Sequence, residues 1–325
     1  MNRRSVLGGV LALGGCAPVV QAPRPFASAE APRFEGAALV AFDGLRLPLS
    51  IWTPQGAPRR VIVALHGMDD YANAFHLAGP WFASRGVALY AYDQRGFGRG
   101  PNRGLWAGEA LMTDDLRAAV LAARAAYPDT PVDVLGESMG GAVAITAFAS
   151  ARPPAADRLV LAAPAVWGWS AQPPLYAASL WGAAHLAPAW RVTAPSWVAR
   201  RIRASDNLEE LRAMGRDRNL IFETRVDAIY GLVTLMQAAS TRIAELHGPA
   251  LYLYGAHDQV IPKPATFRAA ARLPPSDRTA YYANGYHMLL RDLQREVVLA
   301  DILSFLDDPA APLPSGAPPI PRPRR

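Results

Sequence analysis

Short, almost wholly apolar runs alternate with longer helical patterns along most of this chain. The run at residues 61–65, Val-Ile-Val-Ala-Leu, is typical of a strand that is buried on both faces of a sheet. Similar runs lie at residues 87–92, 132–135, 159–162 and 251–254, with a more polar one at 278–283. Helical patterns separate them, at residues 72–85, 111–127, 139–151, 264–273 and 291–306. The alternation predicts the α/β class, with a mostly parallel central sheet flanked by helices on both faces.

Two segments depart from the alternation. Asp43 and Gly44 form a hairpin turn signal between apolar runs at residues 39–42 and 45–52, which predicts antiparallel edge strands. The pattern then breaks at residues 165–241, a helical or irregular stretch that holds five of the eight tryptophans, namely Trp167, Trp169, Trp181, Trp190 and Trp197. We expect a helical cap inserted between two strands, with residues 36–164 and 242–308 forming the core. The tryptophans either pack the cap on the core or line an apolar pocket whose rim meets a membrane interface.

The chain begins with a pattern typical of export. A basic start is followed by a short apolar run that ends at Cys16, and ten apolar residues are too few to cross a bilayer of roughly 30 Å. We expect residues 1–15 to be a signal peptide. The Leu-Gly-Gly-Cys sequence that ends at Cys16 resembles the lipobox of bacterial lipoproteins, which implies lipidation of this cysteine and a membrane-anchored protein of the bacterial cell envelope. The alternative is an ordinary cleaved signal with an incidental cysteine, and Arg3-Arg4 leaves twin-arginine export open.

Proline-rich segments flank the predicted core. We expect residues 16–35 to form an extended tether between anchor and domain, and residues 309–325 to form a disordered Pro/Arg tail.

The 33 basic and 27 acidic residues give a mild net charge of +6, and the arginines are scattered, so we expect no nucleic-acid partner. The single cysteine excludes an internal disulfide framework. No histidine pair has metal-ligand spacing, so we expect no metal and no cofactor. The oligomeric state stays open.

The most informative motif follows the apolar run at residues 132–135. Gly136-Glu137-Ser138-Met139-Gly140 fits G-x-S-x-G in the context that the motif requires, a buried strand followed by a tight turn and a helix. Ser138 must occupy a strained turn that presents its hydroxyl, and Gly136 and Gly140 avoid side-chain collisions across this nucleophile elbow. The helix N-terminus beneath supplies positive potential and free N–H groups.

A serine hydroxyl is a weak nucleophile without a base, and that base needs an orienting carboxylate. His287 lies directly after the last predicted strand, and Asp258 follows the strand predicted at residues 251–254. Both therefore belong to the strand ends where open α/β sheets place their sites. His66 ends the strand at residues 61–65, and we expect it to be a structural histidine bonded to backbone. We also expect Glu137 to be structural, and Asp93 and Arg95 to form an ion pair.

With these residues in place, the chain resembles the α/β-hydrolases, and within that fold the monoacylglycerol lipase and lysophospholipase group. The resemblance covers approximately residues 38–306, except for detail in the cap. The matching segments are residues 65–68, 92–98, 136–141, 255–262 and 285–287. The order Ser138, Asp258, His287 is the order of that topology.

The resemblance implies specific roles. Ser138 would attack an ester carbonyl, His287 would act as its base, and Asp258 would orient the imidazole. The backbone N–H groups of Met68 and Met139 would form the oxyanion hole, with His66 and Gly67 in the oxyanion loop. The implied substrates are lipid-like monoesters, and the implied partner is a membrane surface reached through the anchor. Alternatives on the same scaffold are a thioesterase or perhydrolase, and outside catalysis a lipid-binding lipoprotein.

Overall fold

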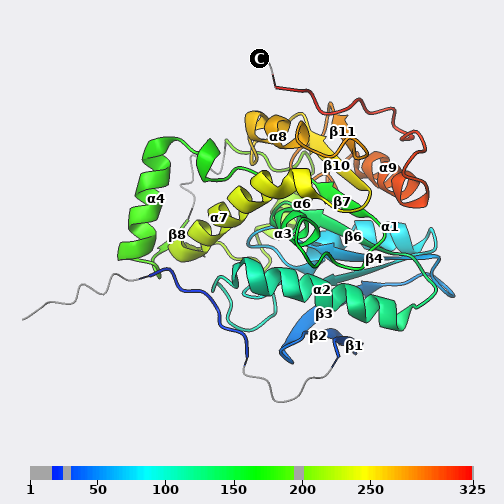
Figure 1. Ribbon diagram of the computed structural model, residues 1–325, viewed down its shortest axis with the longest axis horizontal. Coiled ribbons are helices and arrows are strands. Elements are labelled where there is room, and N and C mark those ends of the chain that lie inside the picture. Colours follow the sequence, from blue (N-terminus) through cyan, green and yellow to red (C-terminus); the bar gives the residue numbers. More distant parts are fainter. Residues whose placement is uncertain (1–16, 25–30, 194–200, 324–325) are drawn as a thin grey trace, which may run out of the picture.

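The computed structural model describes residues 17–24, 31–193 and 201–323. Nine strands form one sheet in the order β1-β2-β3-β5-β4-β6-β7-β10-β11 (Figure 1). From β5 to β11 all neighbouring strands are parallel, whereas β1, β2 and β3 are antiparallel. The parallel strands are β4 (Arg60–Leu65), β5 (Val87–Tyr92), β6 (Val132–Glu137), β7 (Leu159–Ala162), β10 (Ala250–Gly255) and β11 (Arg278–Tyr282). The predicted fold class is confirmed.

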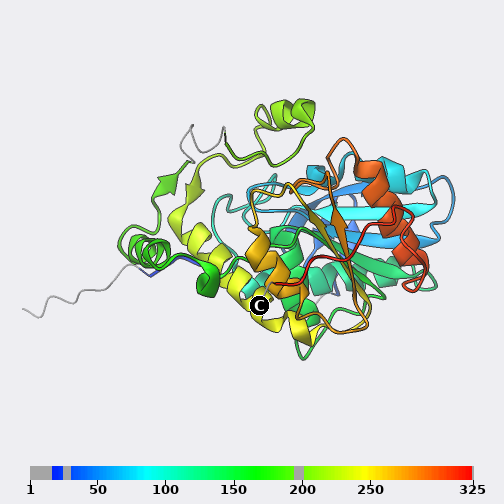
Figure 2. The ribbon, with the colours of Figure 1, turned by 90° about the horizontal axis from the view of Figure 1, so that it is seen from above.

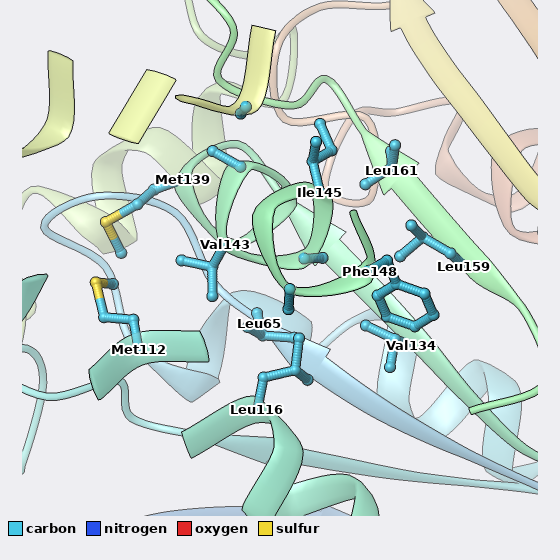
Figure 3. Close-up of a cluster of buried hydrophobic side chains, with 14 of the residues drawn as sticks. Leu65, Met112, Leu116, Val134, Met139, Val143, Ile145, Phe148, Leu159 and Leu161 are labelled. Atoms are coloured by element: carbon cyan, nitrogen blue, oxygen red, sulfur yellow. The ribbon is translucent and has the colours of Figure 1, made fainter. Parts of the chain in front are cut away.

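Helices cover both faces of the sheet. One face packs against α2 (Gly108–Ala126), α3 (Met139–Phe148) and α8 (Lys263–Ala270), and the other against α1 (Ala78–Ala83) and α9 (Arg295–Asp307). Alternate residues of β4 belong to the two different core clusters, because successive side chains of a strand point to opposite faces. Figure 3 shows the first cluster around α3, where Phe148 lies beside Val134 of β6 and Val143 lies on the side of Met139 and Met112.

The predicted edge hairpin is present. β2 (Ala38–Val40) pairs antiparallel with β3 (Arg46–Trp52), and Gly44 in the turn has a φ of 70°, which favours glycine. The helix predicted at residues 72–85 is interrupted: a 3₁₀ turn η1 (Ala72–Phe75) precedes α1, which starts two residues before Pro80. The proline cannot donate a helical hydrogen bond, so it fits only in the first turn.

The break in the alternation becomes a cap between β7 and β10. It contains η2 (Trp169–Ala171), α4 (Pro174–Leu186), a small ribbon of β8 (Arg191–Val192) and β9 (Thr224–Arg225), α6 (Leu208–Met214), α7 (Val226–Arg242) and η3 (Ile243–Glu245). α7 packs across α3, and α4 packs against α7 at one end of the molecule (Figures 1 and 2). No helix of the described ranges is long and apolar enough to cross a membrane.

Both proline-rich flanks differ from expectation where the structure describes them. β1 (Arg33–Glu35) lies within the predicted tether, yet it pairs with β2 and belongs to the sheet. The segment at residues 309–323, predicted to be disordered, lies against β11 and α9. The Tyr281 N–H donates to the Pro318 carbonyl at 2.8 Å, and the side chains of Leu313 and Ile320 are buried. Two apolar side chains and a free strand edge bind a segment whose composition alone suggested disorder.

Candidate active site

Ser138 stands between β6 and α3 with a strained backbone. Its φ of 52° and ψ of −115° are unusual for a residue with a side chain. A side chain at Gly136 would lie 2.6 Å from the Gly140 carbonyl oxygen, and one at Gly140 would collide with the Leu65 backbone. Glycine at both positions therefore allows the tight strand-to-helix turn, which presents the serine hydroxyl at the carboxyl end of the sheet.

A continuous hydrogen-bonded chain joins three side chains from three loops. His287 Nε2 lies 3.0 Å from Ser138 Oγ, and His287 Nδ1 lies 2.9 Å from Asp258 Oδ2. The other carboxylate oxygen, Asp258 Oδ1, accepts hydrogen bonds from the N–H groups of Val260 and Ile261 at 2.8 and 2.9 Å. The structure thus brings together the three residues that the sequence singled out, and it holds the carboxylate in one orientation.

The electrostatics of His287 follow from these neighbours. Burial alone would lower the pKa of the imidazole because it penalises the charged form. The negative charge and hydrogen bond of Asp258, together with the charge of Glu137, outweigh burial and raise the pKa of His287 above its ordinary value. The imidazole is therefore a stronger base than a free histidine.

The two residues predicted to supply oxyanion donors, Met68 and Met139, both belong to segments next to Ser138. Met139 is the first residue of α3, where a backbone N–H has no acceptor within its own helix. Its side chain points into the core beneath the site, so only its backbone can face a substrate (Figure 3). Met68 lines the same cavity as Ser138, and a side chain on Gly67 would lie 3.3 Å from Ser138 Cβ. Glycine at position 67 lets the Met68 loop approach the nucleophile.

His66 has both ring nitrogens occupied. Its Nδ1 lies 2.8 Å from the Gly67 carbonyl, and its Nε2 accepts a hydrogen bond from the Gln94 N–H at 2.9 Å. Burial lowers the pKa of His66, so the ring is neutral and donates through Nδ1. This geometry matches the structural role that we expected, and it joins the oxyanion loop to the loop after β5.

Asp93 and Arg95 do not pair with each other, contrary to expectation. Arg95 forms bidentate bonds with Asp43 and with Asp115, while Asp93 binds Arg99 at 2.9 Å. The side chains of neighbouring loop residues point in different directions, so each meets partners from other segments. Arg95 thereby ties the edge hairpin to α2.

A buried arginine beside the site escaped the sequence analysis. Arg291 lies four residues after His287, and its Nη1 is 2.8 Å from Asp70 and 4.0 Å from Glu210, while its Nη2 is 3.3 Å from Glu137. It therefore joins the His287 loop, the oxyanion loop, the nucleophile elbow and the cap. The sequence offered no signal, because Arg291 looked like the start of a surface helix.

Asp292 is a second residue of this kind. It accepts hydrogen bonds from the Tyr286 N–H at 2.8 Å and the Ser205 hydroxyl at 2.7 Å. The first bond closes the loop that carries His287, and the second attaches this loop to the cap. Its role depends on contacts between distant segments, so only the folded chain reveals it.

The site opens into one large apolar cavity of about 1080 Å³ beneath the cap. Ser138 and His287 form part of its floor, and its walls include Trp167, Trp169 and Trp190. Trp181 instead lies on the outer surface, and Trp197 and Cys16 lie outside the described residues. Within the described ranges, no cluster of three or more histidine, cysteine, aspartate or glutamate side chains is arranged to hold a metal ion.

The fold and the elbow together define the class of this protein as an α/β-hydrolase. A family model described as serine aminopeptidase, S33 (Hydrolase_4) matches residues 56–294, which is most of the chain. The protein therefore belongs to this family of serine hydrolases.

Two curated relatives are similar along nearly their whole length. The chain is 27% identical to a monoacylglycerol lipase of Mycolicibacterium smegmatis, an alignment that covers 81% of this chain and 93% of the relative. It is 26% identical to a monoglyceride lipase of Mus musculus, with 86% and 93% covered.

Solved structures share the fold at lower sequence identity. A monoglyceride lipase of Saccharomyces cerevisiae, a soluble variant with a substrate analog, matches with a TM-score of 0.69 at 15% identity, covering 88% of this chain and 98% of that one. A Paleococcus ferrophilus monoacylglycerol lipase matches with a TM-score of 0.64 at 18% identity, with 80% and 98% covered.

Proposed function

We propose that this protein is a serine carboxylic-ester hydrolase that acts on lipid-like monoesters. The observation that carries the proposal is the hydrogen-bonded chain from Asp258 through His287 to Ser138, which opens into an apolar cavity of about 1080 Å³. An activated hydroxyl supplies the chemistry of acyl transfer, and the cavity supplies room for an acyl chain.

The proposed reaction has two halves. Ser138 Oγ attacks the ester carbonyl carbon while its proton passes to His287 Nε2, and the new imidazolium is stabilised by Asp258. The carbonyl oxygen becomes an oxyanion held by the N–H groups of Met68 and Met139, each of which contributes about 3 kcal/mol to transition-state stabilisation in such sites. The C–O bond of the ester then breaks, and His287 returns its proton to the leaving alcohol.

The second half regenerates the enzyme. Water attacks the acyl group on Ser138 while His287 takes a proton from it. The carbon–Oγ bond breaks, the acid leaves, and the proton returns to Ser138 Oγ. The raised pKa of His287 favours the proton uptake that begins each half of the reaction, because a more basic imidazole accepts a proton more readily.

The proposed substrates are monoacylglycerols or lysophospholipids. Two kinds of support exist: the relatives named monoacylglycerol and monoglyceride lipase, and a cavity whose walls are mainly apolar side chains. An acyl chain transferred from water into such a cavity is stabilised by about 0.8 kcal/mol for each buried CH₂ group.

We also propose that the protein is exported and anchored through a lipid on Cys16. The support is the sequence pattern that ends at this cysteine, a basic start followed by a short apolar run. An anchor would keep a lipid hydrolase at the surface that holds its substrate.

Covalent labelling tests the proposed chemistry directly. A fluorophosphonate probe should label the wild-type protein at Ser138 and leave Ser138→Ala unlabelled, because only an activated hydroxyl displaces the fluoride. A panel of monoacylglycerol, lysophospholipid and short aryl esters then identifies the substrate class. A folded wild-type protein that takes up no label would contradict the esterase and favour a lipid-binding protein.

A further inference from the structure

Asp69, in the oxyanion loop after β4, has an unusual backbone for a residue with a side chain. Its φ of 62° lies in the left-handed region that glycine adopts most readily. Asp69 Oδ1 is buried and has no hydrogen-bond partner among the described residues. Glycine at this position would avoid both the backbone strain and the unpaired oxygen. The two features, in a loop next to the nucleophile, indicate that the side chain has a role other than stabilising the fold.

The other carboxylate oxygen of Asp69 binds the cap. The hydroxyl of Thr224, in β9, donates to Asp69 Oδ2 at 2.5 Å, and the Ile221 N–H donates to the Asp69 carbonyl at 3.0 Å. Burial and the charge of Asp70 raise the pKa of Asp69 to about 6, although the bond from Thr224 opposes them. The carboxylate is therefore mostly ionised at neutral pH, and it accepts a charge-assisted hydrogen bond from the hydroxyl.

Met68 comes directly before Asp69 and has no hydrogen bonds of its own. At the start of the loop, the His66 carbonyl accepts a bond from Gln94 Nε2 at 2.7 Å, and at its end Asp70 forms the ion pair described above. Between these two points, within the ranges that the structure describes, the Met68 N–H and carbonyl form no hydrogen bond. The N–H is thus free to bind an oxyanion, and the bonds of Asp69 are the nearest tertiary restraint on its C-terminal side.

The cap segment that binds Asp69 continues into one wall of the catalytic cavity. Thr224 lies two residues before α7, and several apolar side chains of this helix, among them Met236, line the cavity. The Tyr71 hydroxyl adds a second side-chain bond between the loop and the cap, because it donates to Asp217 Oδ2 at 2.6 Å. The oxyanion loop is therefore bonded to the part of the cap against which an acyl chain would pack.

We propose that Asp69 is a positioning residue, which holds the Met68 N–H toward the oxyanion by binding Thr224 of the cap. Among the described residues, Met68 lines the cavity but Asp69 does not, so Asp69 acts through its neighbour. A group that is misplaced by about 1 Å can cost about a hundredfold in rate, so the loss of one bond at the adjacent residue is enough to slow turnover. The inference rests on the proposed function, in which Met68 supplies an oxyanion donor.

Three variants separate the hydrogen bond from the backbone conformation. Asp69→Gly removes the carboxylate but readily adopts the left-handed conformation. Asp69→Asn keeps an oxygen that can accept from Thr224, and asparagine also tolerates this conformation. Thr224→Val removes the donor on the cap side and leaves Asp69 unchanged. The matched control is Thr241→Val, an exposed threonine near the end of α7 whose hydroxyl accepts a bond from Gln237.

Steady-state hydrolysis of a soluble ester should show the effect in kcat. We expect Asp69→Gly to lower kcat by about 10- to 100-fold and to change KM by less than about threefold, because the oxyanion forms only in the transition state. Thr224→Val should lower kcat in the same range. The double variant should be no slower than the slower single variant, since both changes break the same bond. Asp69→Asn and Thr241→Val should stay within about threefold of the wild type.

A boronic acid inhibitor gives a readout that a merely structural role would not change. Ser138 Oγ adds to the boron atom as its proton passes to His287, and one oxygen of the resulting tetrahedral anion occupies the oxyanion hole. Asp69→Gly should raise the inhibition constant by about the factor by which it lowers kcat, because the adduct resembles the transition state. The melting temperature should stay within about 3 °C of the wild type, since strain relief offsets part of the lost bond.

Two outcomes would overturn the proposal while the wild type is active. One is a kcat of Asp69→Gly within about threefold of the wild type, whatever its melting temperature. The other is a loss of kcat in Asp69→Gly that Thr224→Val does not reproduce, which would show that the bond to the cap is not the cause. A folded wild type that neither hydrolyses esters nor takes up the fluorophosphonate label would instead contradict the proposed function, and this inference with it.

Discussion

At the residue scale, the active site depends on catalytic residues that are each held in a single conformation. Ser138 is held by a left-handed backbone, and His287 is held by hydrogen bonds at both ring nitrogens. Strain of this kind costs roughly 1–3 kcal/mol and persists only where the surrounding structure enforces it. Here the Ser138 N–H donates to the Ala162 carbonyl at 3.0 Å, and the Ser138 carbonyl accepts from the Ala165 N–H at 2.9 Å.

Replacement of the nucleophile gives the first prediction. Ser138→Ala should reduce kcat for a short p-nitrophenyl ester by roughly a millionfold, because the members of such a triad act as a unit. Steady-state hydrolysis measures the effect, and unchanged thermal unfolding of the variant serves as its control. Residual turnover within tenfold of the wild type would be fatal to the proposed mechanism.

The pH dependence of turnover gives the second prediction. The imidazole must be neutral to act as a base, so kcat/KM should rise with pH through the pKa of His287, which lies above its ordinary value. Glu137→Gln removes a negative charge that raises this pKa. The acidic limb of the profile should therefore shift to lower pH.

The measurement is a kcat/KM profile for a soluble ester whose own ionisation does not change over the range. Asp301→Asn is a suitable comparison, since this carboxylate lies beneath β11 and bonds Tyr282 and Ser315 instead of His287. An acidic limb that stays in place or moves to higher pH in Glu137→Gln would contradict the assignment of this charge.

At the element scale, charged contacts hold the catalytic loops together. Arg291 contacts Asp70 of the oxyanion loop, Glu137 of β6 and Glu210 of α6 within a buried cluster. Asp292 closes the adjoining loop through the Tyr286 N–H. The two residues fix how the loops after β4, β6 and β11 lie relative to one another, on which the distance between His287 and Ser138 depends.

Removal of the arginine gives the third prediction. Arg291→Met leaves three carboxylates without their cation, and it should lower the free energy of unfolding by about 3–5 kcal/mol at neutral pH. The unpaired carboxylates would have raised pKa values in the folded variant. Their unfavourable contribution is present above those values and fades as they take up protons, so the deficit should shrink as the pH falls.

Urea unfolding at two pH values measures this effect. Arg268→Met, on the exposed side of α8, should change the free energy of unfolding by no more than about 0.5 kcal/mol. A loss below 1 kcal/mol in Arg291→Met, or one that grows as the pH falls, would show that the cluster does not contribute in this way.

At the scale of the whole molecule, several features lie together at the end that the cap occupies. The cavity rim, the uncharged face of α4 and the start of the described chain lie together there. The sheet and its strand ends occupy the rest of the molecule (Figure 1). The entrance to the catalytic cavity and the start of the described chain are therefore at the same end of the molecule.

Loss of the proposed anchor gives the fourth prediction. Cys16→Ala should leave turnover of a soluble ester unchanged, because the proposed chemistry uses Ser138, His287 and Asp258, and it should reduce turnover of monoacylglycerol held in membranes. Parallel assays of exported protein with the two substrates measure the ratio of membrane-lipid turnover to soluble-ester turnover. An equal loss of both activities would count against a role in placing the enzyme at its substrate.

Much of the architecture could be predicted from local patterns. The strands at residues 61–65, 87–92 and 132–135 were predictable, because burial on both faces demands a continuous apolar run. The elbow was predictable as well, since the tight turn leaves room only for glycine at Gly136 and Gly140. The C-terminal segment was not: its proline content suggested disorder, but Leu313 and Ile320 bury their side chains against the fold.

The sequence by itself determined the fold class, the nucleophile elbow and the three residues of the hydrogen-bonded chain, because each depends on local spacing or on position after a strand. Only the tertiary structure decided the partners of Arg291, the separate partners of Asp93 and Arg95, and the shape of the cavity. The physical reason is that such contacts join segments far apart in the chain. Their energies depend on distance, burial and charge in the folded state, and no local pattern records them.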